Sequence, residues 1–137
     1  MGLVVDTSAL VELERMVGRR SADELPWDEE LVLPAIVWAE ALVGVRLADT
    51  PLRAAQRRAR LEGVQARVPI EPFSAVIAEH YADIFAELMQ AREMIPQNDI
   101  AVAATARAAG FGVLAGPKDE KHFRRVTGLA VHVLRAR

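Results

Sequence analysis

Four carboxylates stand at positions where a purely structural sequence seldom has one. Asp6 directly follows the short apolar run 2–5, and Glu40 is the only acid in the nearly apolar segment 35–47. Asp99 stands at the start of another apolar segment, and Asp119 lies in a polar turn. Carboxylate oxygens suit hard divalent cations such as Mg²⁺, whose bound water can become a nucleophile. The four acids therefore indicate a metal site.

Each acid also has a structural interpretation. Asp6 could cap a helix, and a cap also explains Asp99 or its neighbour Asn98, but not both. Asp119 could belong to a solvated loop. Glu40 is the most telling, because an ionised carboxylate is rarely buried without a partner or a metal, and Arg46 is six residues away, the wrong spacing for a helical ion pair.

The elements that must position these acids alternate along the chain. Short apolar runs predict strands, helical periodicity or capping signals predict helices between them, and a loop with one helical turn at 21–25 follows the first helix. The expected strands cover 2–5, 31–33, 68–71, 112–115 and 129–134. The expected helices cover 9–16, 35–47, 51–66, 73–90, 100–109 and 120–125, where Thr50-Pro51 starts the third. The candidate caps are Thr7 or Ser8, Ser74, and Asn98 or Asp99.

This alternation predicts the α/β class, as a three-layer α/β/α sandwich around a short, mainly parallel sheet of five strands. The length of 137 residues fits a single domain, 1–137. Strand ends and helix starts meet at one edge of such a sheet, so we expect the four acids to converge there. The segment 35–47 is apolar nearly all round and is expected to be largely buried.

Composition narrows the class of protein further. The apolar fraction of 52% with 26% charged residues is typical of a folded globule, and zero cysteines exclude a thiolate metal site. No run is long enough for a membrane span or a signal peptide, so the default location is the cytoplasm. Residues 1–50 carry a net charge of −6 and residues 51–137 a net charge of +4, so opposing patches are expected.

Four segments carry a resemblance to a known family. Residues 4–10, Val-Val-Asp-Thr-Ser-Ala-Leu, are similar to the opening of PIN-domain nucleases, especially the VapC-type toxins of toxin-antitoxin pairs. Glu40 in 39–42, Asp99 in 98–106, and Asp119 followed by 128–131 resemble the later motifs in the same order. The match spans almost the whole chain, although Pro117 stands where the family often has a supporting Thr or Ser.

The resemblance implies a magnesium-dependent endoribonuclease, with Mn²⁺ as a substitute ion, acting as the toxin of a type II toxin-antitoxin system. Asp6, Glu40, Asp99 and Asp119 would hold the metal and carry catalysis, with Thr7, Ser8 and Asn98 supporting them. The implied partners are RNA and a small antitoxin whose Arg or Lys reaches the acids. The expected docking surface is the helix pair 35–66, which could instead bury a homodimer contact.

Two basic groups could meet the RNA backbone. Lys118, Lys121, Arg124 and Arg125 lie beside an acidic candidate and are preferred over Arg53, Arg57, Arg58 and Arg60 on one helix. The histidines at 80 and 132 are expected to be structural, and His122 lacks a nearby His or Cys for a zinc site. Trp38, Tyr81 and Phe85 are expected in the core, and Trp27 fits either a loop or the core.

Other functions fit less well. A haloacid-dehalogenase-like phosphatase needs a second Asp two residues after the first, where Ser8 stands. A response-regulator receiver needs an acceptor Asp after a middle strand, and 68–72 supplies none. The remaining alternative is a catalytically degenerate PIN fold that binds protein or RNA, which would have no need for Glu40 in an apolar helix.

Overall fold

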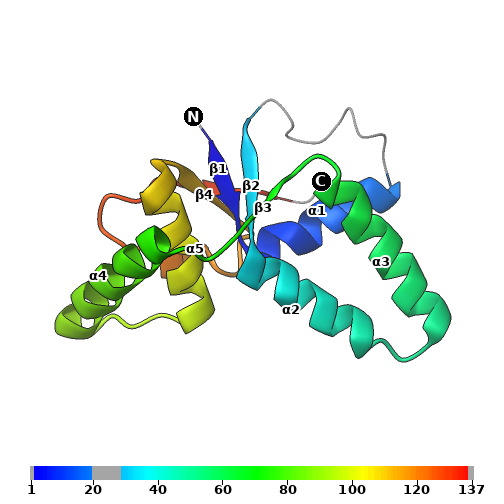
Figure 1. Cartoon of the computed structure of the whole chain (residues 1–137), viewed down its shortest axis with the longest axis horizontal. Coiled ribbons are helices and arrows are strands. Elements are labelled where there is room, and N and C mark those ends of the chain that lie inside the picture. The colour runs from blue at the N-terminus through cyan, green and yellow to red at the C-terminus, as the bar shows by residue number, and fades with distance from the viewer. Residues whose placement is uncertain (1, 20–28, 136–137) are drawn as a thin grey trace.

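Five short strands form one entirely parallel sheet in the computed structural model, which describes residues 2–19 and 29–135 (Figure 1). The strands are β1 (Leu3–Val5), β2 (Leu31–Pro34), β3 (Ile70–Glu71), β4 (Gly112–Ala115) and β5 (Val131–Val133), in the order β3-β2-β1-β4-β5. The α/β sandwich expected from the sequence is therefore confirmed. Trp27 and the helical turn expected at 21–25 lie outside the described residues.

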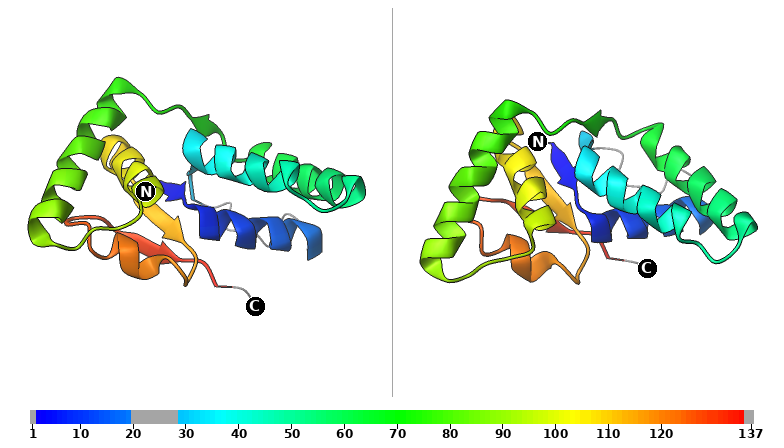
Figure 2. Two further views of the ribbon diagram at one scale, coloured as in Figure 1. Left: turned by 90° about the horizontal axis from the view of Figure 1, so that it is seen from below. Right: turned by 60° about the horizontal axis from the view of Figure 1, so that its bottom comes forward.

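The strand order determines which helices cover each face. The chain moves outward from β1 to β3 through α1 (Thr7–Arg19), α2 (Ala35–Arg46) and α3 (Pro51–Gln65). It then crosses to β4 and β5 through α4 (Ala75–Ala91), α5 (Gln97–Ala109) and α6 (Glu120–Phe123). Right-handed crossovers in opposite directions place the two sets on opposite faces. The contacts agree, since α1 packs on α2 and α3, and α5 packs on α4 and α6 (Figure 2).

The hydrophobic core lies between the sheet and the two helical layers. Val4, Val5 and Leu33 are fully buried on the central strands. Helix α5 buries every residue from Ile100 to Ala106, and four of these seven residues are alanines. Small side chains let the helix lie close to both the sheet and α4. This packing fixes the first turn of α5, where Asp99 stands.

Several boundaries predicted from the sequence are confirmed. Thr50 and Ser74 cap α3 and α4 by accepting hydrogen bonds from the backbone N–H groups of Arg53 and Ile77. Gly110 ends α5 in the left-handed conformation that glycine favours, with φ of 70°. Two expected caps are wrong. Helix α5 begins at Gln97 after Pro96 without a side-chain cap, and α1 already begins at Thr7.

The expected burial of the segment 35–47 is also wrong. In α2 only Val37, Ala41 and Val45 are buried, whereas Val43 is 54% exposed and Leu47, just beyond the helix, is 78% exposed. The helix lies at the rim of the domain, where α3 and the sheet cover one side only, so its apolar pattern exceeds what the fold can cover. Within the described residues, no helix is long and apolar enough to cross a membrane.

Candidate metal centre

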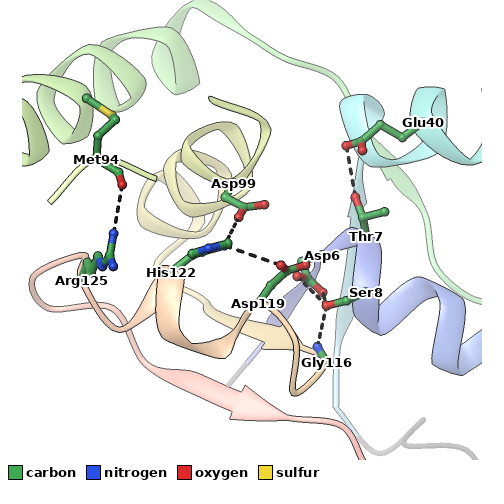
Figure 3. A network of polar contacts seen from close by, with 10 residues as sticks. All are labelled: Asp6, Thr7, Ser8, Glu40, Met94, Asp99, Gly116, Asp119, His122 and Arg125. Carbon is green, nitrogen blue, oxygen red and sulfur yellow. Dashed lines mark hydrogen bonds and ion pairs between the residues drawn. The ribbon is translucent and has the colours of Figure 1, made fainter. Parts of the chain in front are cut away.

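The carboxyl ends of the central strands bring the four predicted acids to one edge of the sheet. Asp6 follows β1, Glu40 stands on α2 after β2, and Asp119 lies in the turn after β4. Asp99 joins them from the first turn of α5. Ligand sites of open parallel sheets form at this edge. Figure 3 shows the four side chains with the residues that hold them.

Asp6 is fully buried and is held by the first turn of α1, which the turn after β4 supports. The Ser8 hydroxyl lies 3.0 and 2.9 Å from the two carboxylate oxygens and donates to them, and the Ala9 backbone N–H donates to Oδ1 at 2.7 Å. The Gly116 N–H in turn donates to Ser8 Oγ at 2.9 Å. Asp6, rather than Thr7 or Ser8, therefore satisfies the free N–H at the start of α1.

Gly116 allows this approach because it has no side chain. A Cβ at this position would lie 2.9 Å from both Cβ and Oγ of Ser8, closer than such atoms come in folded proteins. The glycine thus ties the turn after β4, which carries Asp119, to the turn after β1. Sequence reasoning missed this role, because a lone Gly after a strand has many explanations.

Asp99, Asp119 and His122 form a second, more accessible group. His122 Nδ1 lies 2.8 Å from Asp99 Oδ2 and 3.5 Å from Asp119 Oδ1. One potential ligand atom from each of the three residues lies within 4.8 Å of the others, as a shared metal requires. The sequence indicated that His122 lacks a nearby His or Cys for a zinc site, and the group holds neither, but the sequence did not reveal that His122 binds Asp99. The spacing of Asp119 and His122, three residues apart across the start of α6, was the available signal.

Glu40 reaches the site from α2 through Thr7. The hydroxyl of Thr7, the first residue of α1, donates a hydrogen bond to Glu40 Oε1 at 3.1 Å. Glu40 is partly exposed rather than buried. Its side chain therefore lies at the edge of the site, and the Thr7 hydrogen bond fixes its direction.

Burial and the charges of neighbouring acids raise the pKa of two of the carboxyls, Asp6 and Asp99. Burial raises the pKa of Asp6 to about 7, despite the hydrogen bonds from Ala9 and Ser8, and the charges of Asp119 and Asp99 raise it further. Burial also raises the pKa of Asp99. The His122 hydrogen bond and charge oppose this, while the charges of Asp119 and Glu40 add to it. These mutual effects place Asp6, Glu40, Asp99 and Asp119 in one electrostatic unit.

The donor set fits a hard divalent cation. It offers carboxylate oxygens and one imidazole, without thiolates, and it concentrates negative charge that a cation would neutralise. Half-buried Asp99, Asp119 and His122 leave an open side for water and substrate. The residues present therefore suit Mg²⁺ or Mn²⁺.

The predicted basic residues divide into paired and unpaired cations. Arg124 pairs with Glu120 at 3.0 Å, and Arg125 donates to the Met94 carbonyl at 3.0 Å. Lys118 and Lys121 are exposed and make no ion pair within the described part of the chain. Lys118 also lines a cavity of about 350 Å³ with Thr7, Ser8, Glu12, Arg15 and Asp119.

Three arginines of the second basic group, Arg53, Arg57 and Arg58, have structural partners. Arg57 binds Glu14 on α1 through two hydrogen bonds of 3.2 Å, and Glu14 is only 5% exposed. Arg53 pairs with Asp49, and Arg58 pairs with Glu62 while lying over the Trp38 ring. Arg57 thus ties α3 to α1, away from the acids.

The remaining predicted residues lie outside the acidic network. Asn98 is exposed and lines a neighbouring cavity without binding a carboxylate in the described residues. His132 is exposed on β5, so its predicted structural role is not supported. Trp38, Tyr81 and Phe85 are partly buried against the core, as the sequence indicated.

The chain is similar in sequence to known proteins along nearly its whole length. A model of the PIN domain family matches residues 3–129. Ribonuclease VapC1 of Rickettsia felis is 32% identical over 131 residues, covering 96% of this chain and 95% of that protein. Ribonuclease VapC of Rickettsia bellii is 30% identical over 131 residues, with the same coverage of both proteins.

Solved structures have the same fold. DNA-bound VapBC from Salmonella typhimurium aligns with a TM-score of 0.77 at 18% identity, covering 97% of this chain and 98% of that one. FitAcB from Neisseria gonorrhoeae aligns with a TM-score of 0.74 at 26% identity, covering 94% and 95%.

Proposed function

The chain belongs to the PIN domain family, and from this premise we propose that it is a magnesium-dependent endoribonuclease, the toxin of a toxin-antitoxin pair. The observation that carries the proposal is the single electrostatic unit formed by Asp6, Glu40, Asp99 and Asp119 at the sheet edge. Two relatives that cover nearly the whole chain are named ribonucleases, which supports RNA as the substrate.

The four acids would bind the metal from different environments. Asp99 and Asp119 would be the accessible ligands, and Asp6 the buried ligand. Glu40 would bind from α2, on the opposite side of the site from Asp119 and α6 (Figure 3). When bound, Mg²⁺ or Mn²⁺ supplies polarisation of the scissile phosphate and a lowered pKa for a bound water. Thr7 and Ser8 orient the carboxylates of Glu40 and Asp6, and His122 orients that of Asp99.

RNA would approach along the side of the site that carries unpaired lysines. Lys118 precedes Asp119 and lines the cavity beside it, and Lys121 follows within the same turn and helix. Their charge offsets the repulsion between the RNA backbone and the acids. Arg124 and Arg125 follow on the same segment, but each must leave its present partner before it binds phosphate.

A small antitoxin is the proposed protein partner, since the similar solved structures include VapBC complexes. Its Arg or Lys would enter the acidic cluster, because an Arg can bridge two carboxylates in place of a metal. The corner between α2 and α3 offers a docking surface, with Val43, Leu47 and Leu52 all more than half exposed. A homodimer contact could use the same exposed apolar side chains.

RNA cleavage by the purified chain tests the enzymatic proposal. We expect cleavage with Mg²⁺, none with EDTA, and recovery when Mg²⁺ is restored. Asp99→Asn should reduce the rate more than about hundredfold, since loss of a ligand exceeds loss of a supporting contact. Asp83→Asn, an exposed acid on α4, is the matched control and should cleave normally. A catalytically degenerate PIN fold would bind RNA and cleave none in any metal.

Co-expression with the adjacent gene tests the partner. A stable complex in which cleavage is suppressed supports the antitoxin and its blockade of the site. A stable complex with unchanged cleavage refutes blockade, and no complex at all favours a stand-alone nuclease.

A further inference from the structure

A cavity of about 420 Å³ opens beside the acidic site, between α2, the start of α4 and the first turn of α5. Among the described residues that line it, none is charged. They include two aromatic rings, Phe73 and Tyr81, and two amides, Gln97 and Asn98. The proposed nuclease chemistry uses none of these four side chains.

The aromatic side of the cavity is held in place yet open to solvent. The Phe73 ring meets Tyr81 edge to face at a centroid distance of 6.1 Å, and Tyr81 stacks on Phe85 at 6.2 Å. Ser74, the next residue, caps α4 and so fixes the backbone beside Phe73. Phe73 nevertheless remains 51% exposed. A half-exposed ring that its neighbours hold in place can accept a second flat ring.

The amide side supplies hydrogen-bonding groups. Gln97 and Asn98 are exposed, and neither side chain makes a hydrogen bond within the part of the chain that the structure describes. An amide presents both donors and an acceptor, so it can match the edge of any base. Ala39 and Ala101 line the space between, where small side chains leave room for a flat group.

Two residues that line the cavity are chain neighbours of the acids. Asn98 directly precedes Asp99, and Ala39 directly precedes Glu40. A nucleotide whose phosphate lay at the acids could therefore place its base in this cavity. An uncharged cavity suits a base rather than a phosphate, because the backbone charge requires cations.

We propose that this cavity binds an unpaired base of the RNA substrate by stacking on Phe73 and hydrogen bonding to Asn98 and Gln97. The inference rests on the proposed ribonuclease function and deepens it. The enzyme would then require single-stranded RNA at the cleavage site, since a paired base could not enter. The two amides would set its base preference.

Binding of short RNAs in EDTA tests the cavity separately from cleavage. Fluorescence anisotropy would compare a single-stranded uridine 12-mer with an abasic 12-mer of the same backbone. Phe73→Ala should weaken binding of the uridine 12-mer about tenfold and leave the abasic 12-mer unchanged. Phe73→Trp should retain binding of the uridine 12-mer. Val76→Ala is the control, because Val76 is 62% exposed in the first turn of α4, close to Phe73 in sequence, but lies outside the cavity.

Homopolymers of the four bases test the amides. Asn98→Ala should change the ratio of their affinities severalfold while binding of the abasic 12-mer stays constant. Equal losses on base-containing and abasic RNA, or no loss with Phe73→Ala, would overturn the inference. So would a Phe73→Ala defect confined to antitoxin binding, which would make the cavity a protein interface. Wild type that binds RNA through Phe73 but does not cleave would refute only the nuclease proposal.

Discussion

The two sides of the acidic site are built in different ways. Asp6 is fully buried and held by Ser8 and the backbone of Ala9, with Gly116 as support. Asp99 and Asp119 are half-buried and meet a side chain, His122, at the surface. The Asp6 side is fixed by the fold itself, whereas the Asp99 side can rearrange by rotation of side chains. A metal site needs both kinds of ligand, because a buried carboxylate fixes the position of the ion and accessible carboxylates leave room for the substrate.

The largest expected effect concerns the stability of the metal-free protein. The pKa of Asp6 is raised from 3.8 to about 7, so the folded state holds a proton that the unfolded chain releases near pH 4. Stability should therefore fall between about pH 4 and pH 7, by up to about 4 kcal/mol. Urea unfolding of wild type and of Asp6→Asn isolates this contribution, since the variant lacks the titrating group.

Mg²⁺ should reverse the loss at neutral pH, because the cation stabilises the ionised carboxylate. A difference between wild type and Asp6→Asn that stays constant from pH 4 to 7 would show that burial does not penalise the charge of Asp6.

Ser8→Ala should weaken the fixed side of the site. The change leaves Asp6 with the Ala9 hydrogen bond only and deprives the Gly116 N–H of its acceptor, which should cost about 1–3 kcal/mol. Thermal and urea unfolding measure this loss, and cleavage should fall with it. Ser74→Ala is the matched control, since losing the α4 cap costs about 1 kcal/mol without touching the site. Equal cleavage by the two variants would contradict the role of Ser8.

His122→Ala should affect the accessible side with little effect on stability. Without its hydrogen bond, Asp99 loses its orientation, and cleavage should fall about tenfold to hundredfold. Melting temperatures should change by only a few degrees, because His122 is partly exposed. His132→Ala, at an exposed position on β5, is the control. A His122→Ala enzyme with full activity would assign His122 a structural role.

Lys118→Ala should give the smallest effect, a few-fold rise in KM with a weaker dependence on salt, because one phosphate contact is lost. Arg124→Ala is the comparison variant and should change KM less, since Arg124 is already paired with Glu120. A larger effect of Arg124→Ala than of Lys118→Ala would place the RNA path on the other side of α6.

The sequence predicted those parts of the fold and site that depend on local pattern. Buried runs such as Val4–Val5 and the cap at Ser74 follow from residue type and spacing. Asp6, Glu40 and Asp99 could be chosen because each borders or interrupts an apolar run, whereas Asp119 was chosen with the help of the family resemblance. The link from Ser8 to Gly116 depends on a contact across 108 positions, which no local pattern reveals. The pairing of His122 with Asp99 likewise required knowing how α6 packs on α5.

Glu40 illustrates the same limit of local pattern. The apolar character of 35–47 indicated burial, but burial depends on what covers the helix, and α2 lies at the rim with Val43 exposed. Glu40 nevertheless lies in the acidic unit, because Thr7 and the position of α2 after β2 bring it there.

Calorimetric titration of the purified, metal-free chain with Mn²⁺ at neutral pH measures metal binding by the four acids without any cleavage assay. We expect saturable binding by wild type and by Asp83→Asn, and at least about tenfold weaker binding by Asp99→Asn, since a carboxylate ligand is lost. Equal affinity of wild type and Asp99→Asn for Mn²⁺, or no binding by wild type, would contradict a metal centre built on these acids.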